Sequence, residues 1–237
     1  MAADVRTMLV FGATGRSGLS VVESALGAGW RVHVFVRNPG KLPAALAPRL
    51  TVVTGDLCDG AAVRAAVAAA RPHAVVDCSS ALPFGHAKGQ PPNNANRATF
   101  CRATLDALEA DGRLADCCFV IVGGVLVPEP GGSINAWGSA CLAWLLRTVL
   151  IRAAWREVTA VTHWLFEETP EGARFVYVRM GHMKEEPSRG ELRAEPTLRN
   201  MPRSAVSYCD VGPLLVRLAG DESRQWERKA VFCNYKT

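Results

Sequence analysis

Short apolar runs alternate along the chain with segments of helical periodicity. The first run, residues 8–11, is followed at once by glycine and predicts a buried strand. Behind it, apolar residues recur at helical spacing, which predicts a helix with one buried face. These residues are Leu19, Val22, Ala25 and Leu26. The pattern changes from strand to helix within a few residues, as it does at the start of an α/β fold.

The same alternation continues to residue 122. Further strands are predicted at residues 31–36, 50–53, 73–77 and 117–122, and further helices at residues 61–70 and 97–110. Strands that alternate with helices form parallel sheets with right-handed crossovers. The sequence therefore predicts an α/β fold of the Rossmann-like type, with a doubly wound, mainly parallel sheet and helices on both faces.

The second half of the chain is less regular. It is predicted to hold one or two helices at residues 137–168, a strand and its exit at 175–183, the end of a helix at 214–219 and a short strand at 230–233. Asp210 is expected to be the N-cap of the helix that residues 214–219 complete. The polar stretch 184–202 is expected to be a variable excursion on the substrate side, and whether it is a lid stays open. Without a linker or repeat, residues 1–237 form one expected domain, with substrate-side elements at about 125–205.

Three glycines follow the first strand at intervals of three, namely Gly12, Gly15 and Gly18. The helix that starts there has unpaired N–H groups and a partial positive charge at its first turn, and both attract a pyrophosphate. Side chains at the glycine positions would keep the backbone away from the phosphates. The segment is therefore expected to be a dinucleotide cradle, and the alternative is a purely structural turn.

The loop Gly12-Ala-Thr-Gly15-Arg-Ser-Gly18 resembles the opening loop of the atypical short-chain dehydrogenase/reductases, especially the NmrA-like proteins and the biliverdin reductase B/flavin reductase group. The resemblance extends over nearly the whole chain and is strongest at residues 8–60. It implies that this loop binds NADP(H). The loop residues expected to contact the cofactor are Gly12, Thr14, Gly15, Arg16, Ser17 and Gly18.

Cations gather where the second strand is expected to end. Arg37 and Lys41 follow that strand, and Arg16 is expected to point to the same region. No acidic residue lies between Arg31 and Lys41, whereas an acid at this point would favour the free ribose hydroxyls of NAD. Arginine pairs strongly with phosphate, so NADP(H) is expected rather than NAD(H). The alternative is an ordinary solvated loop.

Two more loops are expected to face the cofactor. By the resemblance, Asp56 and Leu57 pack on the adenine edge; Asp56 is also placed to cap the helix that follows, and both roles can hold. After the fourth strand, Ser79, Ser80 and Ala81 are expected near the nicotinamide, where ligands of open α/β sheets bind. The alternative for the serines is turn formation.

The expected catalytic residues of the resembled family are missing. In typical members the fifth strand ends in serine and the next helix carries Tyr-x-x-x-Lys, in which tyrosine is the general acid. Here the strand runs into Gly123-Gly124-Val125, and no tyrosine occurs between Val125 and Phe175. The biliverdin/flavin reductase group also lacks the tyrosine and transfers hydride directly, with a proton available from solvent.

The resemblance suggests a substrate side made of Gly123, Val125 and His182. His182 follows the sixth strand, where the biliverdin/flavin reductase group also places a histidine, and it is the candidate for substrate contact or proton delivery. The alternative is a loop histidine. Trp144, Trp155 and Trp164 form either an aromatic platform or part of the core.

Two functions are left open by these residues. The first is an NADPH-dependent reductase that transfers hydride to a small planar acceptor such as a flavin or quinone. The second is a non-catalytic NADP(H)-binding redox sensor of the NmrA type, which the missing tyrosine and lysine favour. An epimerase or dehydratase would need an acid–base pair that the sequence does not display.

Composition removes other classes. The net charge of +5 includes no basic tract, so nucleic-acid binding is not expected. The eight cysteines contain no C-x-x-C pair, so no metal site or redox dithiol is expected, and several are expected to be buried. No apolar stretch reaches membrane-spanning length and no signal peptide is expected, so we expect a cytoplasmic protein. Monomer and homodimer both stay open.

Overall fold

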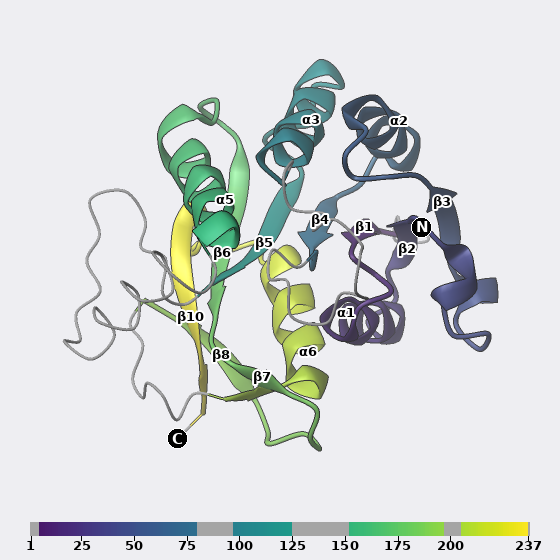
Figure 1. Cartoon of the computed structure of the whole chain (residues 1–237), viewed down its shortest axis with the longest axis vertical. Helices are drawn as coiled ribbons and strands as arrows, with labels where there is room; N and C mark the ends of the chain where they lie inside the picture. The colour runs from purple at the N-terminus through teal and green to yellow at the C-terminus, as the bar shows by residue number, and fades with distance from the viewer. Residues whose placement is uncertain (1–4, 80–96, 125–151, 197–204, 237) are drawn as a thin grey trace.

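The computed structural model describes residues 5–79, 97–124, 152–196 and 205–236, with the backbone alone at residues 152–157. Its main sheet has the strand order β3-β2-β1-β4-β5-β6-β10-β8, and all neighbours are parallel except β8, which runs antiparallel to β10 (Figure 1). The strands are β1 (Thr7–Phe11), β2 (Arg31–Val36), β3 (Thr51–Thr54), β4 (Ala74–Asp77), β5 (Cys118–Gly124), β6 (Arg174–Met180), β8 (Leu192–Glu195) and β10 (Lys229–Tyr235). The predicted Rossmann-like, single-domain α/β fold is confirmed.

Helices cover both faces of the sheet. In Figure 1, α1 (Arg16–Gly27) and α6 (Tyr208–Ala219) lie below it, while α2 (Gly60–Ala70), α3 (Arg97–Ala110) and α5 (Arg152–His163) lie above it. Because successive side chains of a strand point to opposite faces, a central strand contributes side chains to the hydrophobic layers on both faces of the sheet. This double burial explains why the central strands read as continuous apolar runs.

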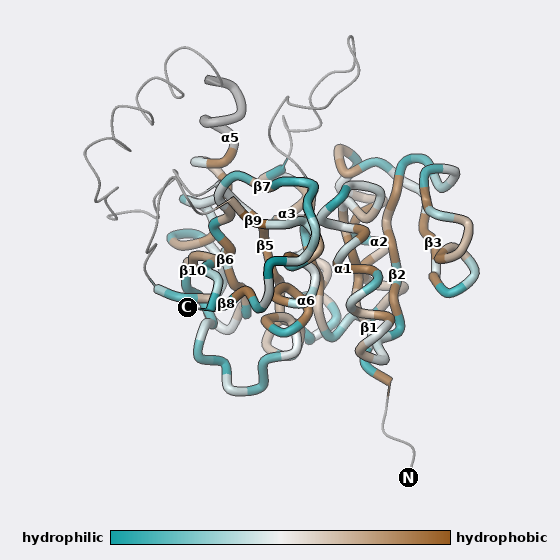
Figure 2. Tube along the Cα trace, turned by 90° about the horizontal axis from the view of Figure 1, so that it is seen from below, coloured by the Kyte–Doolittle hydropathy of each residue, from teal (hydrophilic) through white to brown (hydrophobic). Residues whose placement is uncertain are grey.

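Strand β1 illustrates the two layers. Met8 and Val10 belong to the cluster shared with α1 and α6, whereas Leu9 and Phe11 belong to the cluster shared with α2, α3 and α5. Figure 2 shows hydrophobic residues along the strands and hydrophilic ones in many of the connecting loops. Within the described residues, no helix has both the length and the apolar composition to cross a membrane.

Helices α1 and α6 pack closely at a glycine. A Cβ added to Gly212 would lie 2.1 Å from the carbonyl oxygen of Ser20, and the Gly212 N–H donates to the Ser20 hydroxyl at 3.1 Å. Only a glycine in α6 allows this approach. The first helix of the chain is therefore held directly by a helix 192 residues further along.

Most predicted elements appear within one or two residues of their expected positions. The inward face of α1 is made by Val21, Val22 and Ala25, with Leu19 and Leu26 only partly buried. Four of the described cysteines are buried and form no disulfide, as expected for small apolar side chains; they are Cys101, Cys117, Cys118 and Cys233. Trp164 is also buried, which supports its core interpretation. Trp144 lies outside the described residues.

The stretch 184–202 holds regular structure that the sequence did not predict. Residues Leu192–Glu195 form edge strand β8, and β7 (Met183–Lys184) pairs with β9 (Val206–Ser207) in a small second sheet. The expected variable excursion therefore includes short strands. Residues 197–202 lie outside the described part of the chain, so the lid stays a prediction.

Both predicted helix caps are wrong. The Asp59 carboxylate caps α2, accepting from the N–H groups of Ala61 and Ala62, while Asp56 closes the preceding turn by accepting from the Cys58 N–H at 2.9 Å. Because α2 starts at Gly60, Asp56 is too far ahead of it to cap its first turn.

Asp210 lies inside the first turn of α6, and Ser207 is its N-cap. The Asp210 carboxylate accepts from the Ser188 hydroxyl, the Arg189 N–H and the Tyr235 hydroxyl. Asp210 is thus structural, as expected, but it fixes the segment before β8 to α6 and β10.

Candidate functional site

The glycine loop bends between β1 and α1 in a way that only glycine allows. Gly12 has φ +71°, and a Cβ added there would lie 2.7 Å from backbone atoms of Cys78 and Ser79. The Gly15 N–H donates to the Gly12 carbonyl at 3.0 Å and closes the turn. The loop therefore lies directly against the residues that leave β4, at the carboxyl edge of the sheet where open α/β folds bind ligands.

The start of α1 is built for an anion. Gly15 is the N-cap, with no side chain to bond the first N–H groups, and the first turn has no acidic residue. These N–H groups have no partner within the helix and carry the positive end of its dipole. A Cβ on Gly18 would lie 2.2 Å from the Gly12 carbonyl, so glycine is also needed for the helix to pack on the loop. This geometry fits a pyrophosphate.

Two of the predicted cations lie together beyond β2. Arg37 directly follows the strand, and Lys41 ends the short 3-10 turn Pro39–Lys41, which the Asn38 side chain caps. Both side chains are exposed. The Gly55 N–H donates to the Val36 carbonyl at 3.1 Å, which brings the exit of β3, with Asp56 and Leu57, beside Arg37. The structure thus places the predicted adenosine-side residues around one edge.

Arg16 is turned another way. One guanidinium nitrogen lies 3.1 Å from a carboxylate oxygen of Glu185, and the guanidinium carbon lies 5.6 Å from the ring centre of Tyr208, the first residue of α6. In this structure Arg16 therefore contacts Glu185 and Tyr208, in contrast to the expectation that it points to the same region as Arg37 and Lys41. Exposed pairs of this kind are weak, so Glu185 can be replaced by another anion.

The exit of β4 is fixed by a buried ion pair. The Cys78 N–H donates to the Phe11 carbonyl at 3.0 Å, and the Ser79 N–H donates to Oδ1 of Asp77 at 2.8 Å. Asp77 is fully buried, and its Oδ2 accepts from Nε of Arg97 at 3.0 Å and Nη2 at 2.6 Å. Ser80 and Ala81 lie outside the described residues.

Arg97 connects this exit to two other elements. It starts α3, is 3 % exposed, and also donates to the Val122 carbonyl in β5. Burial is the largest influence and alone would lower the pKa of Arg97, but Asp77, together with the nearby Cys101 and Tyr177, raises that pKa on balance, so the guanidinium stays charged. The ion pair therefore joins β4, β5 and α3 at the carboxyl edge.

The end of β5 rests on a buried tyrosine. A Cβ added to Gly123 would lie 2.0 Å from the hydroxyl of Tyr177, which is fully buried in β6. That hydroxyl lies 3.2 Å from the Thr162 hydroxyl of α5. Burial raises the pKa of Tyr177, so the phenol is neutral. Val125, predicted beside Gly123 on the substrate side, lies outside the described residues.

These buried polar groups were missed from the sequence. Asp77, Arg97, Thr162 and Tyr177 lie in four different elements, and their contacts depend on the tertiary fold. One signal was available. Asp77 ends an otherwise apolar strand, and a buried carboxylate needs a cationic or hydrogen-bonding partner.

His182 follows β6, whereas Arg37 follows β2, and these two strands lie on opposite sides of β1 in the sheet. The segment that contains His182 reaches α1. Its side chain is exposed, and its carbonyl accepts from the Val206 N–H at 2.8 Å. The next residue, Met183, receives a weak hydrogen bond from the Ser17 hydroxyl to its sulfur at 3.5 Å. His182 is therefore one residue from a direct contact with the start of α1.

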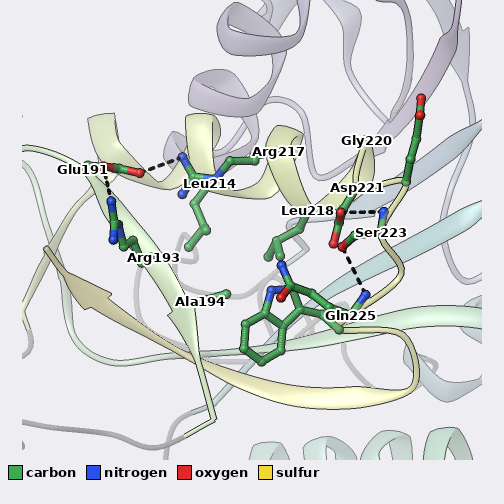
Figure 3. A pocket seen from close by; sticks show the side chains of 12 residues that line it. Glu191, Arg193, Ala194, Leu214, Arg217, Leu218, Gly220, Asp221, Ser223 and Gln225 are labelled. Carbon is green, nitrogen blue, oxygen red and sulfur yellow. Dashed lines mark hydrogen bonds and ion pairs between the residues drawn. The ribbon is translucent and has the colours of Figure 1, made fainter.

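A cavity of about 570 Å³ lies elsewhere, between the second half of α6, β8 and the loop after Gly220 (Figure 3). Leu214, Leu218 and Trp226 form its apolar wall, and charged side chains form its rim. None of the predicted site residues lines it. Within the described part of the chain, no three His, Cys, Asp or Glu side chains gather as metal ligands.

Comparison with known proteins identifies the family. Residues 12–222 match the family described as NAD(P)H-binding. The chain belongs to this NAD(P)H-binding family. The match starts at the first glycine of the cradle and includes every strand of the main sheet except β1 and β10. It confirms the sequence resemblance to the atypical short-chain dehydrogenase/reductases at the level of fold and cofactor class.

Solved structures of NAD(P)H-binding and related proteins share the fold. ChuY, an anaerobilin reductase from Escherichia coli O157:H7, matches with a TM-score of 0.65 and 21% identity over 96% of each chain. A short-chain dehydrogenase/reductase from Veillonella parvula, in complex with NADP, matches with a TM-score of 0.68 and 14% identity over 97% of this chain and 94% of its own. The oxidoreductase ylbE from Lactococcus lactis matches with a TM-score of 0.69 and 15% identity over 98% and 91%.

Proposed function

We propose that this NAD(P)H-binding protein is an NADPH-dependent reductase that transfers hydride directly to a small planar acceptor of the flavin or quinone type. One observation carries the proposal most strongly. The phosphate cradle at Gly12–Gly18 lies directly against the β4 exit, so a dinucleotide seated on the cradle would extend along the carboxyl edge toward β5. The similarity to ChuY, an anaerobilin reductase, supports the same class of reaction.

The adenosine end would be held by the first half of the chain. Gly12, Gly15 and Gly18, with Thr14 and Ser17 beside them, would receive the pyrophosphate at the α1 terminus. Arg37 and Lys41 would pair with the 2′-phosphate of NADP(H), with Asp56 and Leu57 beside the adenine. The structure related to this chain that contains NADP supports that choice.

The nicotinamide end would lie over the exits of β4 and β5. Ser79, Ser80 and Ala81 would face its ribose, while Gly123 and Val125 would form the floor beneath the acceptor. NADPH, when bound, supplies the hydride, and the chain's own task is to hold donor and acceptor in contact and keep water away.

Proton delivery would come from His182 or from solvent. His182 is exposed and lies one residue from the contact with α1, so it is close to the edge where the acceptor would bind. The Tyr-x-x-x-Lys pair of typical relatives is absent from the sequence, so no tyrosine general acid is assigned. Reduction of a flavin or quinone needs no strong acid beyond these sources.

The proposal is tested by titrating the purified protein with NADPH and NADH and then following the absorbance of NADPH with FMN and with menadione. Tight NADPH binding with oxidation that depends on the acceptor is expected. Binding of neither nucleotide would refute the whole proposal.

The second candidate is a redox sensor that binds NADP(H) without catalysis. The missing tyrosine and lysine favour it. NADPH that binds tightly, yet is oxidised by no acceptor, would support the sensor. In that case NADP⁺ and NADPH should differ in their effect on a partner's affinity, since differential binding is what drives such a switch.

A further inference from the structure

Beneath the proposed nicotinamide end lies a set of buried polar side chains that we call the polar floor: Asp77, Arg97, Thr162 and Tyr177. Each is at most 4 % exposed, and they come from β4, α3, α5 and β6. Around them the layer is otherwise apolar, built by residues such as Phe119, Ile121 and Phe175. Burying polar groups in such surroundings costs free energy unless every group is paired.

The polar floor bonds to backbone at the edge of the sheet. Asp77 holds the Ser79 N–H, and Arg97 donates to the Val122 carbonyl. The Tyr177 hydroxyl fills the space beneath Gly123 and lies 3.2 Å from the Thr162 hydroxyl. The four side chains therefore fix the last residues of β4 and β5, on which the proposed donor and acceptor would rest.

Tyr177 has a special place in this set. Its hydroxyl fills the space that a side chain of Gly123 would need, since a Cβ there would be only 2.0 Å away. The phenol thus comes from the neighbouring strand, fills the volume under the end of β5, and supplies a polar group there. The Arg97 guanidinium is close enough to influence it electrostatically.

We infer that Tyr177, supported by Thr162, is a positioning residue that sets the height of the Gly123–Gly124 backbone beneath the nicotinamide and acceptor. This inference rests on the proposed reductase function and adds a residue to it. Tyr177 is fully buried, so it acts through the backbone of β5 and does not itself touch the acceptor. Hydride transfer is sensitive to small displacements, because reacting atoms must approach closely.

The test compares three conservative variants. Tyr177→Phe removes only the phenol oxygen, and Thr162→Val removes its partner. Thr104→Val is the matched control, because Thr104 is also a fully buried helix threonine and bonds its own helix in the same way, to the Phe100 carbonyl at 2.8 Å against 2.7 Å for Thr162 and Val158. The melting temperature of each variant confirms folding.

Two ligands separate the halves of the site. NADPH reports on the whole cofactor, whereas 2′,5′-ADP reports on the adenosine end alone. Tyr177→Phe is expected to lower kcat with menadione by about tenfold and to weaken NADPH binding severalfold, with unchanged affinity for 2′,5′-ADP. Thr162→Val should act in the same direction, and Thr104→Val should leave all three values as in the unmodified protein.

The outcomes separate this inference from the proposed function. Unmodified protein that fails to bind NADPH overturns both. If it binds NADPH and both floor variants match it in NADPH affinity and kcat, Tyr177 is merely structural and the inference alone is overturned. Equal changes in kcat and NADPH affinity in Thr162→Val and Thr104→Val would also overturn it. If the protein binds NADPH without turnover, the inference is tested by binding alone: Tyr177→Phe should weaken NADPH binding relative to 2′,5′-ADP binding, and an unchanged ratio of the two affinities would overturn it.

Discussion

The two halves of the proposed crevice are built by opposite means. At the adenosine half, glycines allow close approach of the backbone because they have no side chain, and the side chains of Arg37 and Lys41 are exposed at the surface. At the β4–β5 half, bulky polar side chains are buried beneath the backbone, as in the Asp77–Arg97 pair. The first half is local in sequence, and the second is assembled from distant segments. Binding would thus depend on the first half, and precise geometry on the second.

The largest expected effect lies in the second half. Arg97→Gln leaves the Asp77 carboxylate buried without its cation, and should lower the free energy of unfolding by about 3–5 kcal/mol. Urea denaturation measures it. Arg102→Gln on the same helix is the control, because its pair with Glu168 is half exposed at 3.0 Å and contributes about 1 kcal/mol or less. If Arg97→Gln and Arg102→Gln lowered the free energy of unfolding by similar amounts, the buried Asp77–Arg97 pair would not have the structural importance assigned to it here.

The next effect concerns the cradle. Gly18→Ala places a methyl group against the Gly12 carbonyl and should cost about 1–3 kcal/mol of stability, with loss of NADPH binding. Gly27→Ala, at the other end of α1, is the control, since a Cβ there meets nothing within 4 Å. Isothermal titration with NADPH and thermal unfolding compare the two. Retained NADPH affinity in Gly18→Ala would argue against the close approach at this loop.

A smaller effect tests the choice of cofactor. Arg37→Ala should weaken NADPH binding by roughly 10- to 100-fold, the worth of a charge-assisted phosphate contact, and NADH binding far less. Arg31→Ala, at the opposite end of the same strand, should change neither. Fluorescence titrations with both nucleotides provide the comparison. Equal losses for NADPH and NADH would refute the 2′-phosphate assignment.

The smallest effect separates two neighbouring aspartates of the first half. Asp59→Ala removes the cap of α2 and should destabilise the protein by about 1 kcal/mol. Asp56→Ala removes one turn hydrogen bond and should destabilise the protein less, while weakening binding of the adenosine end of the cofactor. Denaturation midpoints of the two variants test the order, and a larger stability loss in Asp56→Ala would contradict the observed cap.

Local patterns were sufficient for most of the fold. Apolar runs and glycine turns predicted β1, β2 and α3 closely, because these elements are buried along their whole length or on one face. Edge strand β8 escaped prediction since its four residues, Leu-Arg-Ala-Glu, are short and half charged. An edge strand needs no continuous apolar pattern, and its partner β10 lies nearly forty residues further along.

The site was predictable only where it is local. Gly12–Gly18 and Arg37 follow directly from the sequence around β1 and β2. The direction of Arg16 depends on Glu185, and the polar floor depends on Asp77 meeting Arg97 and on Tyr177 meeting Gly123. Such encounters are set by the strand order, which no local spacing reveals.

The contact of Gly212 with Ser20 has a consequence for the order of folding. The cradle and α1 are made well before α6, since Ser20 and Gly212 are 192 residues apart, yet α1 packs on α6 only when α6 has been made. Contacts between such distant residues are slow to form and leave early segments exposed meanwhile. A nascent chain that stops before α6 would keep the glycine loop in its sequence but lack the helix that holds it in shape, so cofactor capture would have to wait until α6 has been made.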